Sequence, residues 1–159
     1  MKKLLIAVAL CTAFFAVPAA AQMYVGGGIG ASRTDTTEKS WKLYSGFQFS
    51  PTWGMELAYN DLGRYRNADI KSWTFAGTGT LPLGANWSLL GKLGVAANRP
   101  RFAGASNKSD LLAGIGLGYN LTPKIGLRLE YEDFGRLSKS PAGADSRGQN
   151  VGLSVNYKF

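Results

Sequence analysis

Apolar and polar residues alternate one by one along most of the chain after residue 21. The last segment is the clearest case, because apolar residues at 151, 153, 155, 157 and 159 alternate with Gly, Ser, Asn and Lys. A period of two is typical of extended chain with two chemically different faces. The same pattern predicts eight strands, at residues 24–31, 41–49, 53–59, 70–81, 87–95, 111–119, 125–131 and 151–159.

The connections between these strands alternate in length. Short turns with Pro or Asn are predicted at residues 50–52, 82–86 and 120–124, and long polar loops at 32–40, 60–69, 97–109 and 135–146. Short turns at one end and long loops at the other are typical of outer-membrane barrels, whose short turns lie in the periplasm. We therefore predict an all-β fold, an eight-stranded antiparallel up-and-down transmembrane β-barrel.

A soluble, lipocalin-like barrel is the alternative, and the second face of the strands argues against it. That face is rich in Gly, Ser, Thr and Ala and carries few charges, so it would make a poor aqueous exterior. It suits the crowded lumen of an eight-stranded barrel, where side chains just fill the space. Aromatic residues stand at the short-turn ends, as an interfacial girdle requires: Trp53, Trp87, Tyr119, Tyr157 and Phe159.

The first 21 residues have the features of a cleaved signal peptide. Lys2 and Lys3 precede an apolar stretch at residues 4–17, and three alanines at 19–21 form a small-residue cleavage site before Gln22. The apolar stretch is shorter than the roughly 20 residues that a membrane helix needs. We expect residues 22–159 to be one outer-membrane β-barrel domain without disulfides, because the single cysteine, Cys11, lies in the signal.

Several motifs resemble the OmpA/OmpX-type family of small outer-membrane barrels. Residues 54–59 (GMELAY) with 62–64 (LGR) are similar to the third strand of that family, and 127–131 (LRLEY) with Phe134 to the seventh. The C-terminal strand, ending in Tyr157 and Phe159, resembles the signal that delivers such proteins to the outer-membrane insertion machinery. The resemblance implies an integral protein of the bacterial outer membrane. Because the sequence stops at Phe159, we expect no periplasmic peptidoglycan-binding domain of the kind that larger members carry.

Charged residues on the second face form the most specific candidate site. Four are predicted at similar depths in the lumen, with Lys42 and Glu132 as further candidates: Glu56, Lys92, Arg128 and Glu130. Buried charges are costly unless paired, so we expect ion pairs across the lumen. One hypothesis is a gate in which Arg128 moves between Glu56 and Glu130, as the family resemblance also suggests. A static plug is the interpretation that we favour.

The predicted loops are basic, in a chain of net charge +8. Arg and Lys pair well with phosphate, so these residues are candidates for contacts with lipopolysaccharide. Solvated loops that bind nothing are the alternative. We expect an exported basic protein to meet anionic lipid and no nucleic acid. The candidate lipid-phosphate contacts are Arg64, Arg66, Arg99, Arg101 and Arg136, and Lys108, Lys139 and Arg147 lie in the same segments.

Catalysis is not expected, because the chain has no histidine and no cysteine beyond the predicted signal. The usual nucleophile-activating pairs are therefore missing, and no metal or cofactor is predicted. The glycine runs at 26–30 and 114–118 do not open helices, so they are interpreted as small lumen residues rather than phosphate loops.

Two functions of different classes remain open. One is a monomeric structural barrel that supports outer-membrane integrity and presents basic loops to lipopolysaccharide or external partners. The other is a narrow passive diffusion channel for ions or small solutes. Eight strands normally leave no continuous water path, which favours the first.

Overall fold

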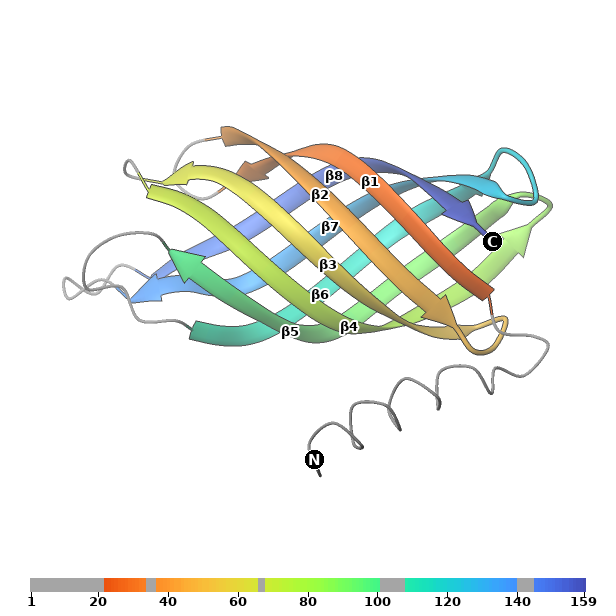
Figure 1. Cartoon of the computed structure of the whole chain (residues 1–159), viewed down its shortest axis with the longest axis horizontal. Helices are drawn as coiled ribbons and strands as arrows, with labels where there is room; N and C mark the ends of the chain where they lie inside the picture. Colours follow the sequence, from red (N-terminus) through yellow and green to blue (C-terminus); the bar gives the residue numbers. More distant parts are fainter. Residues whose placement is uncertain (1–21, 34–36, 66–67, 101–107, 140–144) are drawn as a thin grey trace, which may run out of the picture.

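The computed structural model describes residues 22–33, 37–65, 68–100, 108–139 and 145–159. These residues form one closed antiparallel β-barrel in which each strand pairs with its sequence neighbours (Figure 1). The strands are β1 (Gln22–Arg33), β2 (Thr37–Gln48), β3 (Trp53–Tyr65), β4 (Ala68–Gly84), β5 (Trp87–Pro100), β6 (Lys108–Asn120), β7 (Ile125–Lys139) and β8 (Asp145–Lys158). No helix in these described ranges is long and apolar enough to cross a membrane.

Pairing of the first strand with the last closes the barrel. β1 and β8 run antiparallel, with Val25 opposite Tyr157 and Ala31 opposite Val151. The Phe159 amide then donates to the Met23 carbonyl over 3.0 Å, which ties down the C-terminal end. Closure removes the free edges that an open sheet would present, so the backbone polar groups are satisfied within the barrel.

The two faces of the strands point as the alternation predicts. On β5, Leu93 is 66 % exposed on the outside, whereas Lys92 beside it is only 5 % exposed. The outer face is mainly apolar, and the inner face carries most of the buried polar and charged side chains. The predicted eight-stranded up-and-down transmembrane barrel is therefore confirmed.

Aromatic side chains form a belt at each end of the apolar band. At the short-turn end the rings of Trp87 and Tyr119 lie 4.8 Å apart, centroid to centroid. A second belt lies nearer the loop end, where Tyr59 packs 5.5 Å from Trp41 and 5.1 Å from Trp73. The sequence analysis identified the first belt and missed the second. Two belts are the expected boundaries of the hydrocarbon layer around an outer-membrane barrel.

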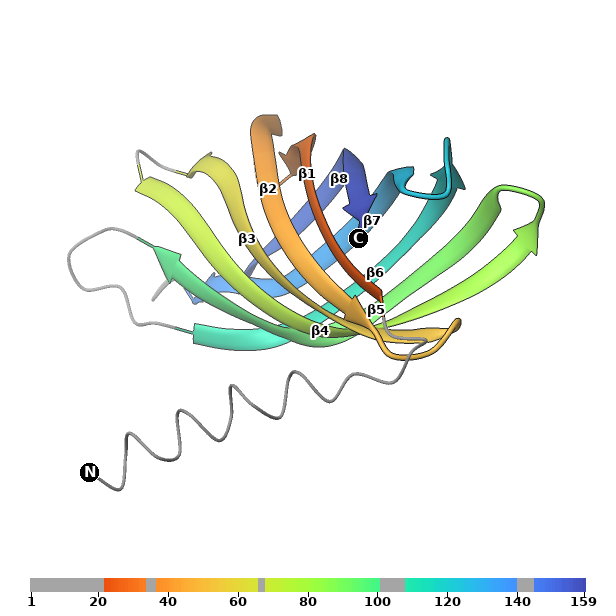
Figure 2. The same ribbon diagram turned by 45° about the vertical axis from the view of Figure 1, so that its right-hand side comes forward.

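The prediction of four long loops is wrong in extent, because the strands continue through most of those segments. Ser32 pairs with Glu38, and Ala97 pairs with Ser109, inside regions that the alternation left as loops. Beyond the second belt both faces of a strand can meet water, so the apolar alternation ends while the backbone ladder goes on. Figure 2 shows these strand ends extending toward the grey connections. Residues 34–36, 66–67, 101–107 and 140–144 lie outside the described part of the chain.

Two inward tyrosines fill the lumen between β1 and β2 and depend on glycines opposite them. Tyr24 pairs with Gly46, and Tyr44 pairs with Gly26, in the same ladder. The two rings meet edge to face with centroids 6.2 Å apart. A Cβ atom added at either glycine would overlap the facing tyrosine ring. Close packing here therefore requires glycine at both positions.

We expect Gly46→Ala to lower the free energy of unfolding by about 1–3 kcal/mol, because the new methyl group must displace the Tyr24 ring. Gly91→Ala is the matched control, since a Cβ atom at Gly91 has nothing within 4 Å. Urea unfolding of both variants in lipid vesicles, followed by tryptophan fluorescence, measures the difference. Equal unfolding midpoints would contradict the packing argument.

Candidate functional site: the lumen charge cluster

Six charged side chains from four strands meet inside the barrel and are called here the lumen charge cluster. They are Lys42 on β2, Glu56 on β3, Lys92 on β5, and Arg128, Glu130 and Glu132 on β7. The four residues that the sequence analysis singled out are brought together, and its two further candidates belong to the same network. Alternation aims each of these side chains into the lumen, where they are largely buried.

Lys92 is the centre of the cluster, because its ammonium group contacts all three carboxylates. The Nζ atom lies 2.5 Å from Glu56 Oε1, 2.6 Å from Glu130 Oε1 and 3.2 Å from Glu132 Oε1. An ammonium group carries three donors, so this geometry can use all of them.

Lys42 and Arg128 complete the network on either side of Lys92. The Lys42 Nζ atom lies 2.5 Å from Glu130 Oε2 and 3.1 Å from Glu132 Oε1. Arg128 Nη1 donates to Glu56 Oε2 over 2.9 Å. In this arrangement Arg128 pairs with Glu56, while the two lysines hold Glu130. The proposed exchange of Arg128 between the two carboxylates would have to displace lysine contacts.

Two tyrosines that the sequence analysis did not select are part of the site. The Tyr24 hydroxyl donates to Glu56 Oε2 over 3.0 Å, and the Tyr44 hydroxyl lies 3.1 Å from Ser154 Oγ. The Arg128 guanidinium lies 4.5 Å from the centroid of the Tyr24 ring and 5.4 Å from that of Tyr44. Both tyrosines occupy positions of the residue-by-residue alternation that face the lumen, and this pattern could have identified them from the sequence.

The cluster balances three cations against three carboxylates in a buried volume. The Glu56 side chain is 3 % exposed, and that of Arg128, the most exposed member, is 11 %. Removing such groups from water is expensive unless each charge has partners of opposite sign. Here every member has at least one, so the arrangement can remain fully ionised inside the barrel.

The glycine run on β6 provides the space for the cluster. Gly114, Gly116 and Gly118 stand directly opposite Glu132, Glu130 and Arg128 on β7. A Cβ atom at Gly116 would come within 2.9 Å of Glu130 Cγ. These glycines are lumen residues that make room for larger neighbours.

An apolar layer lies on the loop side of the cluster. Phe134 occupies the inward position after Glu132 on β7, and it is completely buried. It packs with Leu62, Ala76, Ala96 and Leu112. The Ser32 hydroxyl on β1 donates to the Leu62 carbonyl on β3 over 2.5 Å. The lumen is therefore blocked first by ion pairs and then by packed apolar side chains.

Among the described residues, no group of three or more His, Cys, Asp or Glu is placed to hold a metal ion.

The basic residues predicted for loops lie mostly on strands. Arg64, Arg99 and Arg136 stand near the loop ends of β3, β5 and β7, and Arg66 and Arg101 lie outside the described residues. Lys108, Lys139 and Arg147 are likewise strand residues.

At the other end of the barrel, the C-terminal aromatic residues point to the outside: Tyr157 is 40 % and Phe159 67 % exposed on the outer face.

Two outward lysines were missed by the sequence analysis. Lys39 lies two residues from Trp41 on β2, and Lys71 lies two residues from Trp73 on β4, each on the loop side of the second aromatic belt. Neither forms an ion pair with another described residue.

The barrel and its girdles define an integral protein of the bacterial outer membrane. The profile of the outer membrane protein beta-barrel domain matches residues 7–159, and the chain belongs to this family. The predicted family resemblance and localisation are thereby confirmed. No curated protein matches the chain.

Solved outer-membrane barrels share the fold. Ail of Yersinia pestis, in complex with the heparin analogue sucrose octasulfate, is 20 % identical, with 88 % of this chain and 99 % of that one covered at a TM-score of 0.61. Neisserial surface protein A is 14 % identical, with 87 % and 97 % covered and a TM-score of 0.62. The outer membrane enzyme PagL is 13 % identical, with 86 % and 99 % covered and a TM-score of 0.64. At these identities the likeness is one of fold.

We expect Glu56→Gln to lower the free energy of unfolding by about 3–5 kcal/mol, because it leaves a buried excess of positive charge. The double variant Glu56→Gln, Lys92→Met restores the balance and should recover part of the loss. Urea unfolding in lipid vesicles measures all three proteins. A single variant as stable as the unmodified barrel would show that the cluster does not depend on charge balance.

Proposed function

We propose that the protein is a closed structural barrel of the outer membrane whose loop-end rim binds the phosphate groups of lipopolysaccharide. The observation that carries the proposal is the position of Lys39 and Lys71. Both point outward just beyond the second aromatic belt, where the rings of Trp41 and Trp73 mark the membrane boundary. Two residues span about 7 Å along a strand, which at a barrel tilt of about 40° places each lysine about 5 Å further out along the membrane normal.

Phosphorylated headgroups of the outer leaflet are expected at that level. An ammonium group outside the hydrocarbon layer can reach a phosphate while its aliphatic stem stays against the barrel. Arg33 adds an exposed cation at the loop end of β1. Arg64, Arg99 and Arg136 stand at the same end of their strands, and we propose them as further members of this basic rim. Arg66 and Arg101 are proposed as members of this rim from the sequence alone.

A related fold offers chemical support for an anion-binding surface. Ail of Yersinia pestis was solved with sucrose octasulfate, a heparin analogue that carries sulfate groups. Sulfate and phosphate oxygens are recognised by the same Arg and Lys donors. Lipopolysaccharide is the partner proposed for this chain because the lysines lie at the membrane boundary rather than at the loop tips.

The remaining parts of the proposal concern assembly and chemistry. We propose that Tyr157 and Phe159 present the last strand to the outer-membrane insertion machinery, and that the barrel is a monomer. We also propose a non-catalytic role. PagL shows that this fold can carry an enzyme, but the present chain contains no histidine for proton transfer.

The blocked lumen supports a structural role over a diffusion channel. The lumen charge cluster and the apolar layer close the same passage in series. A gate built on Arg128 alone would open only the first of these two barriers. We therefore favour the static plug over the gate.

We expect the barrel to remain silent in planar bilayers, and Arg128→Ala to leave it silent, because Phe134 and Leu112 still block the lumen. Single-channel recording measures this, and an unboiled gel confirms that each protein is folded. Steady openings in the variant would instead support the gate and the channel function.

We expect the double variant Lys39→Glu, Lys71→Glu to bind lipopolysaccharide at least about tenfold more weakly, since each lost charge-assisted hydrogen bond is worth about 1.5–3 kcal/mol. Surface plasmon resonance on the detergent-solubilised barrel measures the affinity. Lys124→Glu is the control, because this lysine lies in the turn between β6 and β7 at the opposite end of the barrel. Unchanged binding in the double variant would reject the proposed rim.

A further inference from the structure

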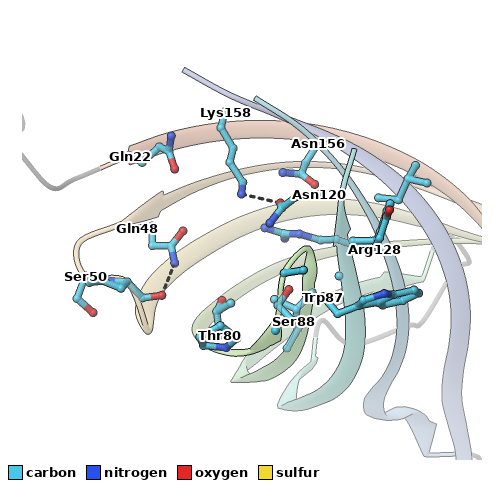
Figure 3. Close-up of a pocket in the computed structure, with 18 residues that line it drawn as sticks. Gln22, Gln48, Ser50, Thr80, Trp87, Ser88, Asn120, Arg128, Asn156 and Lys158 are labelled. Carbon is cyan, nitrogen blue, oxygen red and sulfur yellow. Dashed lines mark hydrogen bonds between the residues drawn. The ribbon is translucent and has the colours of Figure 1, made fainter. Parts of the chain in front are cut away.

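The short-turn end of the lumen holds a cavity of about 610 Å³, shown in Figure 3. Arg128 separates it from the rest of the lumen charge cluster and contributes to its wall. This end faces the periplasm in an outer-membrane barrel. The cavity is therefore distinct from the basic rim at the loop end, and what it binds does not depend on the proposed function of that rim.

The charge of the cavity wall is entirely positive among the described residues. Arg128 and Lys158 line it, and no Asp or Glu does. The Lys158 Nζ atom donates to Asn120 Oδ1 over 2.9 Å, which points the ammonium group across the mouth (Figure 3). Arg128 donates to Glu56 through Nη1, and a guanidinium has five donors in all. Glu56 balances the charge of Arg128, whereas Lys158 forms no ion pair with another described residue, so Lys158 adds an unbalanced positive charge to this polar space.

A third group in the wall is an unsatisfied hydrogen-bond donor. Asn156 is 2 % exposed, and its Nδ2 atom has no hydrogen-bond partner among the described residues. A buried donor without a partner costs about 1–3 kcal/mol, so such groups call for an explanation. Asn156 stands beside Gly126 in the β7–β8 ladder, and it lines the same cavity as Arg128 and Lys158.

We propose that this periplasmic cavity is a binding site for a small oxyanion, a phosphate group held by Arg128, Lys158 and Asn156. The three side chains come from β7 and β8; Arg128 and Lys158 are donors only, and the unpaired group of Asn156 is its Nδ2 donor, which suits the acceptor oxygens of a phosphate group. A phosphate group would neutralise the local excess of positive charge and satisfy the Asn156 amide. The group can belong to free phosphate or to a phospholipid headgroup at the barrel mouth.

The test is a titration of inorganic phosphate into the barrel extracted from outer membranes in detergent. Side-chain NH signals of Asn156 and Arg128 are followed by NMR at constant ionic strength, with chloride as the balancing ion. The expected result is a saturable shift of both signals. A shift that does not saturate, or its absence at tens of millimolar phosphate, would overturn the proposal.

Matched lysine variants separate a built site from general attraction to a basic protein. Lys158→Gln should weaken phosphate binding about tenfold, the loss expected for one charge-assisted hydrogen bond. Lys124→Gln removes the same charge at the same end of the barrel, but this residue does not line the cavity. It should bind as the unmodified protein does. Equal losses in both variants would reject the site.

The source of the phosphate group is decided in nanodiscs without added phosphate. The chemical shift of the Asn156 side-chain amide is compared between nanodiscs of phosphatidylglycerol and nanodiscs of phosphatidylcholine. A shifted signal in the anionic bilayer alone, which added phosphate no longer moves, identifies a lipid headgroup as the occupant. A signal that is the same in both bilayers, and that phosphate still shifts, identifies the free anion.

Discussion

Charge balance inside a closed barrel is the constraint on which the rest of the structure depends. Joining β1 to β8 satisfies the backbone but creates a lumen whose central side chains are buried. Every charged side chain that alternation directs into that space must find a partner there. Lys92 meets this requirement by contacting three carboxylates at once, and Lys42 and Arg128 complete the balance from neighbouring walls.

Packing and electrostatics are coupled in the same few strands. β6 carries glycines where β7 carries Arg128, Glu130 and Glu132, so small residues on one strand accommodate long charged residues on the next. The tyrosines of β1 and β2 lie over glycines in the same manner. The interior is thus filled by pairs of large and small residues across neighbouring strands. A filled and neutral interior is well suited to a barrel that stays closed.

Among the described residues, the lysines outside the lumen charge cluster stand toward the two ends of the barrel. Lys39 and Lys71 stand outside the second aromatic belt, and Lys158 stands at the periplasmic mouth. Both ends of a membrane barrel meet phosphorylated lipid headgroups or soluble anions. The charges of the described residues are therefore balanced in the blocked centre of the lumen and positive at both ends. This arrangement supports the proposed role of a closed barrel that binds anions at its ends.

The sequence by itself determined the number of strands, the face that each residue occupies and the end at which the short turns lie. These features follow from a local period of two and from turn residues, which need no knowledge of distant segments. Only the tertiary structure decided that Lys42 and Glu132 join the cluster, that Arg128 pairs with Glu56, and that Asn156 and Lys158 share a cavity. Those contacts join strands far apart in sequence, and strand tilt and register set them. The predicted loops were too long for a related reason, since backbone pairing continues where the difference between the two faces ends.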